Sequence, residues 1–238
     1  VNGVQIIKTA VAEKRTWLLE PEAKRLLKLH GAAVSADALA QSADQAVGLA
    51  QKAAGPVVLK IVSPDIMHKS DAGGVRVGLR TAAQVRKAYQ DIVVNARCFN
   101  PSADLRGVMV SPMAPEGLEV IIGTKIDDQF GPVILFGLGG VLVEVVQDVA
   151  FRVLPLTLGA ARAMIGEIQA SALLDGYRGR PPADREALAR LLVSVSEVVD
   201  SYPEIAEMDL NPVLVHERGL SVVDARVLLR SPTGTGSA

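Results

Sequence analysis

The chain has 238 residues, of which 49% are hydrophobic, 21% are charged and 3% are aromatic, and its formal net charge is −1. This length fits one large domain or two smaller lobes around an aliphatic core. Near-neutral charge and few aromatic rings argue against a nucleic-acid partner, which usually leaves a basic surface or base-stacking side chains. No apolar stretch is long enough to span a bilayer, and the single cysteine, Cys98, allows no internal disulfide. We therefore expect a cytoplasmic protein without a membrane anchor.

The first half of the chain predicts three helices and a pair of strands. Residues 1–19 carry little pattern, so we expect a lead-in or an interdomain linker there. Pro21 suits a first helical turn, and the pairs Ser42/Gln45 and Thr81/Gln84 resemble capping boxes. The expected elements are helices at 20–30, 42–54 and 81–98, strands at 56–62 and 75–79, and a glycine-bearing loop at 63–74.

The second half is richer in β-branched residues and predicts strands before helices. The expected strands cover 105–113, 118–126, 133–138, 141–146 and 151–154, the helices cover 158–168 and 184–201, and a hairpin joins 205–216 to 220–225. The fold class is α/β (α+β), with two lobes that meet near residue 110. We expect an N-terminal lobe at 20–110, a C-terminal lobe at 111–230 and a loose tail at 231–238.

Lys60 interrupts an apolar strand, between Leu59 and Ile61. A lysine is costly to bury unless it meets an anion, so one interpretation is a phosphate ligand. The alternative is that strand alternation points Lys60 to solvent. The loop that follows contains His68 and the pair Gly73-Gly74, whose backbone N–H groups would be free to approach an anion, although such pairs are often plain turns.

Two further patterns lie in the second half. Gly139 and Gly140 end an apolar strand, where they permit either a ligand against the backbone or a bend of the sheet. In the hairpin, the alternating residues Glu207, Asp209 and Asn211 share one face of a strand. Asp224 follows Asn211 by 13 residues across the turn, so the two can meet. Amide and carboxylate oxygens suit Mg²⁺ when phosphates complete its shell; the alternative is a solvated strand face.

Several blocks in a fixed order resemble the ATP-grasp part of NDP-forming acyl-CoA synthetases. The resemblance is strongest to the β subunit of ADP-forming acetate–CoA ligases and weaker to the nucleotide-binding subunit of succinyl-CoA synthetases. The blocks are GPVVLKIVSPDIMHKSDAGGVRVGL, GLEVIIGTKIDDQFGPVILFGLGGVLVEVVQDVAFRVLPL, LLDGYRGRPPAD, EIAEMDLNPVLV and VVDARVLL. The resemblance implies an ATP-grasp fold of two α/β lobes with the nucleotide between them.

The resemblance also implies roles for residues of the first lobe. Lys60 matches the family lysine that holds the nucleotide phosphates, and Gly73 and Gly74 match the mobile glycine-rich lid. His68 matches a family histidine that accepts a phosphoryl group from a carrier histidine on the partner; the other interpretation is a lid residue. The adenine-hinge position falls on three residues, Val110, Ser111 and Met113, where Ser111-Pro112 replaces the more usual Gln or Glu.

In the second lobe, the resemblance makes Glu119 a nucleotide-contacting acid and makes Asn211 and Asp224 the Mg²⁺ ligands. ATP or ADP is the expected nucleotide, with GTP as the alternative. The family's complete enzyme also has a CoA-binding domain and a ligase domain, and the chain shows no GxGxxG after a strand. We therefore expect a hetero-oligomer with a CoA-binding/ligase subunit or fused domain, and no acyl-CoA synthesis by the chain alone.

Two functions follow from the resemblance. The first is the phosphoryl-transfer part of an ADP-forming acyl-CoA (acetate–CoA) ligase, an acid–thiol ligase that moves phosphate between ATP/ADP and a histidine. The alternative is a non-catalytic, nucleotide-sensing ATP-grasp module of a fused acyl-CoA-linked protein acetyltransferase. Retention of Lys60, Asn211 and Asp224 favours catalysis.

Overall fold

The structure is a computed structural model of the chain that describes residues 2–140, 148–177, 179 and 181–230. The strand expected at 141–146 and the tail expected at 231–238 lie outside the described residues. Within those ranges, no helix is both long enough and apolar enough to cross a membrane.

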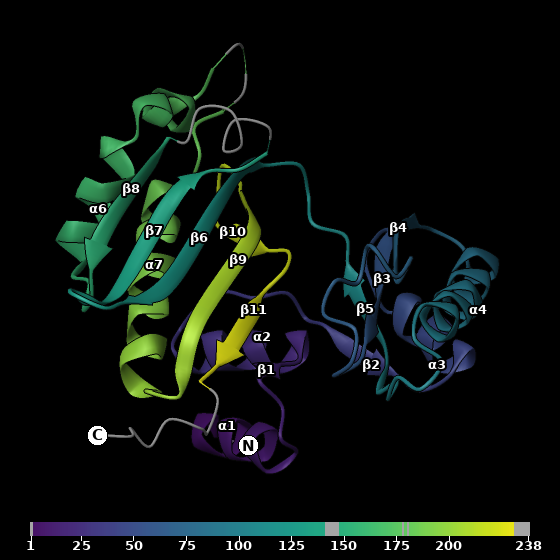
Figure 1. Cartoon of the computed structure of the whole chain (residues 1–238). Coiled ribbons are helices and arrows are strands. Elements are labelled where there is room, and N and C mark those ends of the chain that lie inside the picture. The colour runs from purple at the N-terminus through teal and green to yellow at the C-terminus, as the bar shows by residue number, and fades with distance from the viewer. Residues whose placement is uncertain (1, 141–147, 178, 180, 231–238) are drawn as a thin grey trace, which may run out of the picture. The chain divides into compact units, whose positions relative to one another are not determined.

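The chain divides into two compact units (Figure 1). The small unit comprises residues 35–114, and the large unit comprises residues 1–34 together with 115–238. The small unit is thus an insertion between two segments that fold together. These boundaries differ from the expected lobes, because residues 1–34 pack with the C-terminal part of the chain instead of forming a linker and the start of the first lobe.

The small unit is a four-stranded antiparallel sheet with two helices on one face. The strand order is β2-β5-β3-β4. Apolar residues of both helices pack against alternate residues of β3 and β5, such as Leu59 and Val110. Its elements are β2 (Ala38–Ala40), α3 (Ala43–Ala50), β3 (Val57–Val62), β4 (Val75–Leu79), α4 (Ala82–Phe99) and β5 (Gly107–Pro112).

The caps of these two helices lie where the sequence predicts them. Thr81 and Gln84 form a reciprocal capping box at the start of α4, as expected. Ser42 caps α3 by accepting the N–H of Gln45, but the Gln45 side chain accepts from the N–H of Gln41 instead of completing the box.

Among its described residues, the large unit is built on a seven-stranded sheet in the order β1-β11-β9-β6-β7-β8, with β10 also paired to β9. Neighbouring strands along this order run antiparallel, and the first described strand pairs with the last described one, Trp17 opposite Leu228. Its strands are β1 (Trp17–Leu18), β6 (Leu118–Asp127), β7 (Gly131–Leu138), β8 (Val149–Val153), β9 (Ile205–Val215), β10 (Leu220–Val222) and β11 (Arg226–Leu229).

Helices cover one face of this sheet, and Figure 1 shows the other face, here called the open face, toward the viewer. The helices are α1 (Gly3–Ala12), α2 (Glu20–Leu29), α6 (Leu158–Glu167), the 3₁₀ segment η1 (Gln169–Asp175) and α7 (Arg185–Ser201). Buried side chains of β6 and β9, among them Ile122, Met208 and Leu210, join the helices in one core. Their neighbours in sequence therefore point to the open face.

Residues 1–19 are not a patternless lead-in. Asn2 caps α1 through a hydrogen bond from the N–H of Gln5, and Ile6, Ile7 and Ala10 join the core. Gly3 packs against Tyr202 so closely that a Cβ at position 3 would lie 1.8 Å from the tyrosine hydroxyl oxygen. The N-terminal segment is thus an integral part of the large unit.

Candidate functional site

Lys60 lies in the interior strand β3 of the small unit. It pairs with Met109 on β5 and with Val75 on β4. Its neighbours Leu59 and Ile61 pack in the core, so Lys60 points to the opposite face of the sheet, yet it is only 6% exposed. The alternative of a solvent-facing lysine is therefore wrong, and the burial of this ammonium group agrees with a role that involves an anion.

The loop between β3 and β4 presents His68 and closes on its two glycines. His68 is exposed. The N–H of Gly73 donates to the carbonyl of Ser70 at 2.9 Å, and the N–H of Gly74 donates to the carbonyl of Lys69 at 2.8 Å. Both N–H groups are therefore engaged within the loop, and in this structure they do not present free donors to an anion.

The same glycines are required by packing. Gly73 has φ +60°, and a Cβ there would lie 2.8 Å from the Asn95 side-chain nitrogen. At Gly74 a Cβ would lie 2.4 Å from Cγ2 of Ile61. The pair thus anchors the returning strand, and its role as a phosphate-binding lid stays a prediction.

The expected hinge residues lie at the end of β5. The side chain of Val110 packs in the core of the small unit, whereas Ser111 pairs with Val58 and lies on the Lys60 face of the sheet. Ser111 is 5% exposed, and its hydroxyl has no hydrogen-bond partner in the described part of the chain. Met113 is 45% exposed, and its N–H donates to the carbonyl of Pro56 at 2.9 Å.

In the large unit, Glu119 lies directly beside the two glycines at the end of β7. The N–H of Gly139 donates to the Glu119 carbonyl at 2.7 Å. A Cβ at Gly140, where φ is +70°, would lie 3.2 Å from Oε2 of Glu119. The absence of side chains at 139 and 140 therefore leaves room for the Glu119 carboxylate, which the sequence alone did not connect with these glycines.

Asn211 and Asp224 lie opposite each other in the hairpin. The flanking ladder pairs are Val222 with Val213 and Arg226 with Asp209, which places Asp224 across from Asn211. The N–H of Val223 donates to the carbonyl of Pro212 at 3.0 Å and holds this register. The expected meeting of an amide and a carboxylate across the ladder agrees with this register.

Arg226 joins the acidic residues of the same open face, and it is a residue to which the sequence motifs assigned no role. Its guanidinium nitrogen Nη2 lies 3.6 Å from Oε1 of Glu207 and 3.7 Å from Oδ2 of Asp209. Burial raises the pKa of the Asp209 carboxyl, the Arg226 charge opposes this rise, and the nearby charges of Glu207 and Asp224 add to it. The sequence did contain a signal for this role, because Arg226 lies opposite Asp209 on the strand that carries the predicted metal ligand Asn211.

The donor set of the hairpin fits Mg²⁺ completed by phosphates. In the described ranges, no three His, Cys, Asp or Glu side chains converge as a metal-binding group. Mg²⁺ usually takes one or two carboxylates plus substrate phosphates and waters, which is what Asp224 with the Asn211 amide offers. The hairpin therefore suits a metal that arrives with a polyphosphate better than a closed protein cage.

Asp184 positions this hairpin from the helix side. Its carboxylate accepts the N–H of Ala187, which caps α7, and the N–H of Gly219 in the hairpin turn, at 2.8 and 2.7 Å. These bonds lower the pKa of the Asp184 carboxyl, the Gly219 bond most of all. The turn that brings Asn211 and Asp224 together is thus tied to the start of α7.

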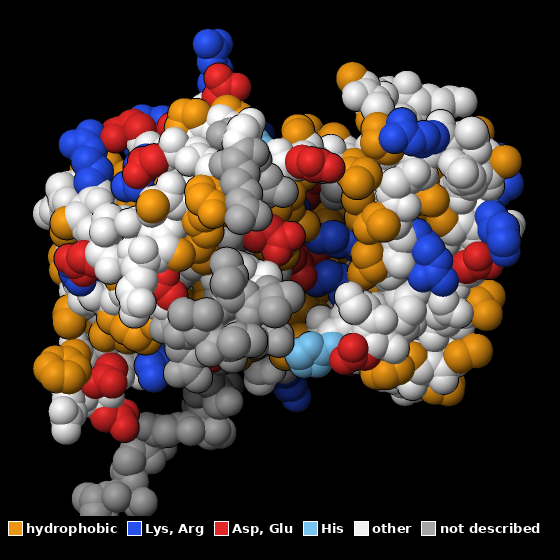
Figure 2. Space-filling model, turned by 90° about the horizontal axis from the view of Figure 1, so that it is seen from above, with side chains coloured by type: hydrophobic (Ala, Val, Ile, Leu, Met, Phe, Trp, Pro, Cys, Tyr) orange, Lys and Arg blue, Asp and Glu red, His pale blue; other side chains and the backbone are white. Residues whose placement is uncertain are grey.

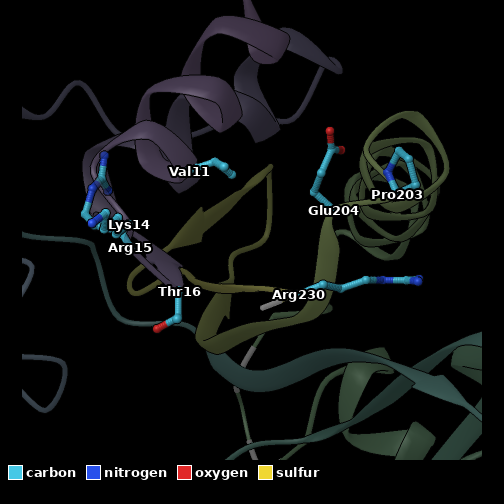
Figure 3. Close-up of a pocket in the computed structure, with 7 residues that line it drawn as sticks. All are labelled: Val11, Lys14, Arg15, Thr16, Pro203, Glu204 and Arg230. Carbon is cyan, nitrogen blue, oxygen red and sulfur yellow. The ribbon is translucent and has the colours of Figure 1, made fainter. Parts of the chain in front are cut away.

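A pocket of about 610 Å³ lies elsewhere in the large unit (Figure 3). It contains none of the residues predicted for nucleotide or metal. The pocket is lined by Val11, Lys14, Arg15, Thr16, Pro203, Glu204 and Arg230.

On the surface shown in Figure 2, acidic and basic side chains are interspersed, in keeping with the near-neutral charge.

The predicted residues fall into two groups. The small unit holds Lys60, His68, the glycine pair and the hinge, and the large unit holds Glu119, Gly139, Gly140, Asn211 and Asp224. Each group lies wholly within one unit. The convergence of both groups on one polyphosphate stays a prediction.

Comparison with known proteins shows the family of the chain. The ATP-grasp domain family matches residues 9–229. The β subunit of ADP-forming acetate–CoA ligase I from Pyrococcus furiosus is 47% identical over 225 residues, which cover 94% of this chain and 97% of that one. Acetyl-coenzyme A synthetase 1 from Ca. Korarchaeum cryptofilum, solved with coenzyme A, Ca-AMPCP and HgCl+, matches with a TM-score of 0.92 and 46% identity over 96% of this chain and 100% of that one.

A second structure of the Korarchaeum protein contains coenzyme A and Mg-AMPPCP, with its phosphohistidine segment pointing towards the nucleotide binding site. It matches with a TM-score of 0.84 and 44% identity over 96% of this chain and 100% of that one. The fold and the resemblance inferred from the sequence are confirmed. The chain belongs to the ATP-grasp domain family, and within it to the group of the β subunits of ADP-forming acetate–CoA ligases.

Proposed function

We propose that this chain is the nucleotide-binding, phosphoryl-transfer subunit or domain of an ADP-forming acyl-CoA (acetate–CoA) ligase. The observation that carries the proposal is the placement of Asn211 opposite Asp224, in a chain 47% identical to such a β subunit. The nucleotide is ATP or ADP, with GTP as the alternative, and the metal is Mg²⁺. A relative solved with Mg-AMPPCP supports this choice.

The proposal includes a partner. A β subunit implies a second subunit or a fused domain, which would supply the CoA and acyl sites and a carrier histidine. The assembled enzyme would be a hetero-oligomer, and the chain alone would bind nucleotide without making acyl-CoA. A cytoplasmic location suits its exposed free thiol, Cys98.

The overall reaction interconverts acid, CoA and ATP with acyl-CoA, ADP and phosphate. The half-reaction of this chain moves one phosphoryl group between a histidine nitrogen and the terminal oxygen of ADP. When bound, Mg²⁺ offsets negative charge on the phosphates. Lys60 adds a fixed positive charge, Asn211 and Asp224 hold the metal, and Glu119 contacts the nucleotide. Transfer of this kind depends mainly on positioning and electrostatics.

His68 is the proposed acceptor on this chain. Its exposed position in the loop after the Lys60 strand leaves the ring accessible to a partner segment. The P–N bond of the carrier phosphohistidine breaks as a P–N bond to an unprotonated nitrogen of His68 forms. That bond then breaks as ADP oxygen takes the phosphoryl group, and the reverse sequence starts from ATP.

Isothermal calorimetry on the isolated chain tests the nucleotide site. We expect uptake of Mg·ADP and Mg·ATP by the isolated chain, and acyl-CoA turnover only after a CoA-binding partner subunit is added. Uptake without any transfer in the complex would support the sensor function instead. No uptake of adenine or guanine nucleotide with magnesium present contradicts the whole proposal.

Mass spectrometry under alkaline conditions tests His68 in the complex incubated with ATP. We expect an acid-labile phosphoryl group on the peptide that contains His68, and its loss in His68→Ala. His216→Ala is the control, because that ring is bound to the Glu116 carbonyl and the Ser221 hydroxyl in the large unit. Full turnover with no label at His68 would mean that phosphate passes directly between ADP and the carrier.

A further inference from the structure

Arg226 lies between the acidic side chains of the open face, next to the proposed metal ligands. It pairs with Asp209 across the ladder, and its guanidinium is also 3.6 Å from Glu207. Ala225 and Val227 are buried in the core, so Arg226 and Asp224 point to the same open face. The guanidinium of Arg226 thus lies beside two carboxylates, those of Glu207 and Asp209, and Asp224 lies on the same face of the sheet.

We propose that Arg226 is a built-in cation that keeps divalent metal from binding at this hairpin until nucleotide phosphates are present. The proposal rests on the proposed function, in which Asn211 and Asp224 hold Mg²⁺. Arg226 is a positioning residue here. It acts through the charge and the orientation of its acidic neighbours, and no contact with substrate is assigned to it.

The oxygen ligands of the hairpin show why such a control is needed. Three carboxylates and the Asn211 amide on one strand pair are the hard oxygen donors that Mg²⁺, Mn²⁺ and Ca²⁺ prefer. Without a compensating charge they would repel one another and attract a free cation. A metal bound too early would occupy the site without the phosphates it must hold.

Basic side chains of the same chain balance the negative charge of these acids. Glu207 and Asp209 share the guanidinium of Arg226, and Lys125 on β6 lies opposite Glu207 in the ladder. In the described ranges, these acids do not converge as a three-ligand metal group. A divalent ion that arrives without phosphates therefore meets carboxylates that are already paired with Arg226. The positive charge of Arg226 also repels the doubly charged ion.

Nucleotide phosphates change this balance. A polyphosphate brings several negative charges and its own oxygen ligands, so Mg²⁺ needs only Asp224 and Asn211 from the protein. The metal can then bind while Arg226 stays paired with Glu207 and Asp209. Ordered binding of this kind requires no movement of the chain.

Electron paramagnetic resonance of free Mn²⁺, measured on the nucleotide-free full chain, tests the role of Arg226. We expect no Mn²⁺ uptake by the wild type or by Arg226→Lys at concentrations where Arg226→Gln binds one ion. The expected gain in affinity is about tenfold or more, because a unit charge near the ion is removed. Adding Asp224→Asn to Arg226→Gln should abolish the gain.

Arg162→Gln is the matched control. Arg162 also holds a carboxylate, that of Glu186, through two hydrogen bonds, but on the helices α6 and α7. It should leave Mn²⁺ uptake at the wild-type level, and an equal gain in this variant would overturn the proposal. Arg226→Met replaces Arg226→Gln if the latter fails to fold.

Two outcomes separate this inference from the proposed function. If the wild type binds Mg·ADP but neither Arg226→Gln nor Arg226→Met gains Mn²⁺ uptake, only the role of Arg226 fails. If these variants instead weaken binding of metal-free ADP in EDTA without gaining Mn²⁺ uptake, Arg226 is a phosphate ligand and the proposal is overturned. If the wild type binds no Mg·ADP, the proposed function fails, and this inference fails with it.

Discussion

Glu119 and Gly139 are joined by a hydrogen bond of 2.7 Å, from the N–H of Gly139 to the carbonyl of Glu119, and they pack backbone against backbone. A Cβ at position 139 would lie 3.0 Å from Cβ of Glu119 and 3.1 Å from its carbonyl carbon. Because backbone atoms cannot move aside cheaply, the close approach of β6 to the residue after β7 favours glycine at position 139.

Gly139→Ala should therefore lower the free energy of unfolding by about 1–3 kcal/mol, the usual cost of overpacking. It should also weaken nucleotide binding, because it displaces the proposed contact at Glu119. Gly159→Ala in helix α6 is the control, since a Cβ at position 159 would meet nothing within 4 Å. That control should stabilise the chain by about 0.4–1 kcal/mol, because alanine leaves the unfolded chain fewer conformations to lose. Urea denaturation and calorimetry measure both effects, and equal stability changes in the two variants would contradict the packing argument.

Lys60→Met removes the buried charge of β3 and keeps most of the side-chain volume. We expect phosphoryl transfer in the assembled enzyme to slow by a factor of about 100–1000, as when one preorganised electrostatic group is removed from an active site. Lys87→Met is the control, because Lys87 is exposed on α4 in an ion pair with Asp91. Unchanged single-turnover rates in Lys60→Met, with the near-ultraviolet circular dichroism preserved, would exclude Lys60 from the site.

Asp224→Asn should raise the magnesium concentration needed for nucleotide binding, because an amide replaces the only charged ligand of the proposed pair. Asn211→Asp should have a smaller effect or the opposite one, since it adds a carboxylate at the facing position. Calorimetric titration of ADP at several Mg²⁺ concentrations measures the shift. An identical Mg²⁺ requirement in both variants and the wild type would place the metal elsewhere.

Asp184 makes stability depend on pH in acid. Its folded pKa is lowered, first by the N–H of Gly219 and then by the N–H of Ala187. The stabilisation is therefore complete above the ordinary pKa of aspartate, about 3.9, and is lost as pH falls through the lower folded value. In Asp184→Asn, the unfolding free energy should vary less with pH between about 5 and 2 than in the wild type.

Asp200→Asn is the control for this measurement, because Asp200 lies exposed on the same helix. Urea denaturation at a series of pH values compares the three proteins. A slope in Asp184→Asn as steep as that of the wild type would contradict the role of the two backbone bonds.

Elements with strong local signals were predictable from the sequence. The strand at Val75–Leu79 has the predicted bounds, and the capping box at Thr81 and Gln84 starts α4 as predicted. The hairpin was predictable because alternation fixes one face of β9 and the turn fixes the register of its partner, but the second strand, expected at 220–225, is divided into β10 (Leu220–Val222) and β11 (Arg226–Leu229). These signals depend on neighbours within a few residues, or on one short turn.

Elements that depend on distant partners were missed. The short strands β1 and β2 gain their pairing from β11 and β5, far along the chain, and have no alternation of their own. Helix α1 did have a signal, since Gly3, Ile6, Ile7 and Ala10 recur at helical spacing after the capping residue Asn2. The division into units was missed for the same reason as the short strands, because only tertiary packing assigns residues 1–34 to the large unit.

The site was predicted unevenly. Burial of Lys60 and the opposition of Asn211 and Asp224 agree with the arguments made from the sequence. The proximity of Glu119 to Gly139 and Gly140 could not be deduced, because it requires the register of β6 against β7. The role of Gly73 and Gly74 in closing their loop was missed because it depends on packing against Asn95 and Ile61.

The pairing of Trp17 with Leu228 has a consequence for how the protein is made. A ribosome delivers residues 35–114 as one continuous stretch with its own core, so this part can fold while translation continues. Residues 1–34 emerge earlier, but β1 must wait for β11, which is synthesised after the whole small unit. Until then the apolar side chains of residues 1–34 lack their partners on the later strands and helices of the large unit.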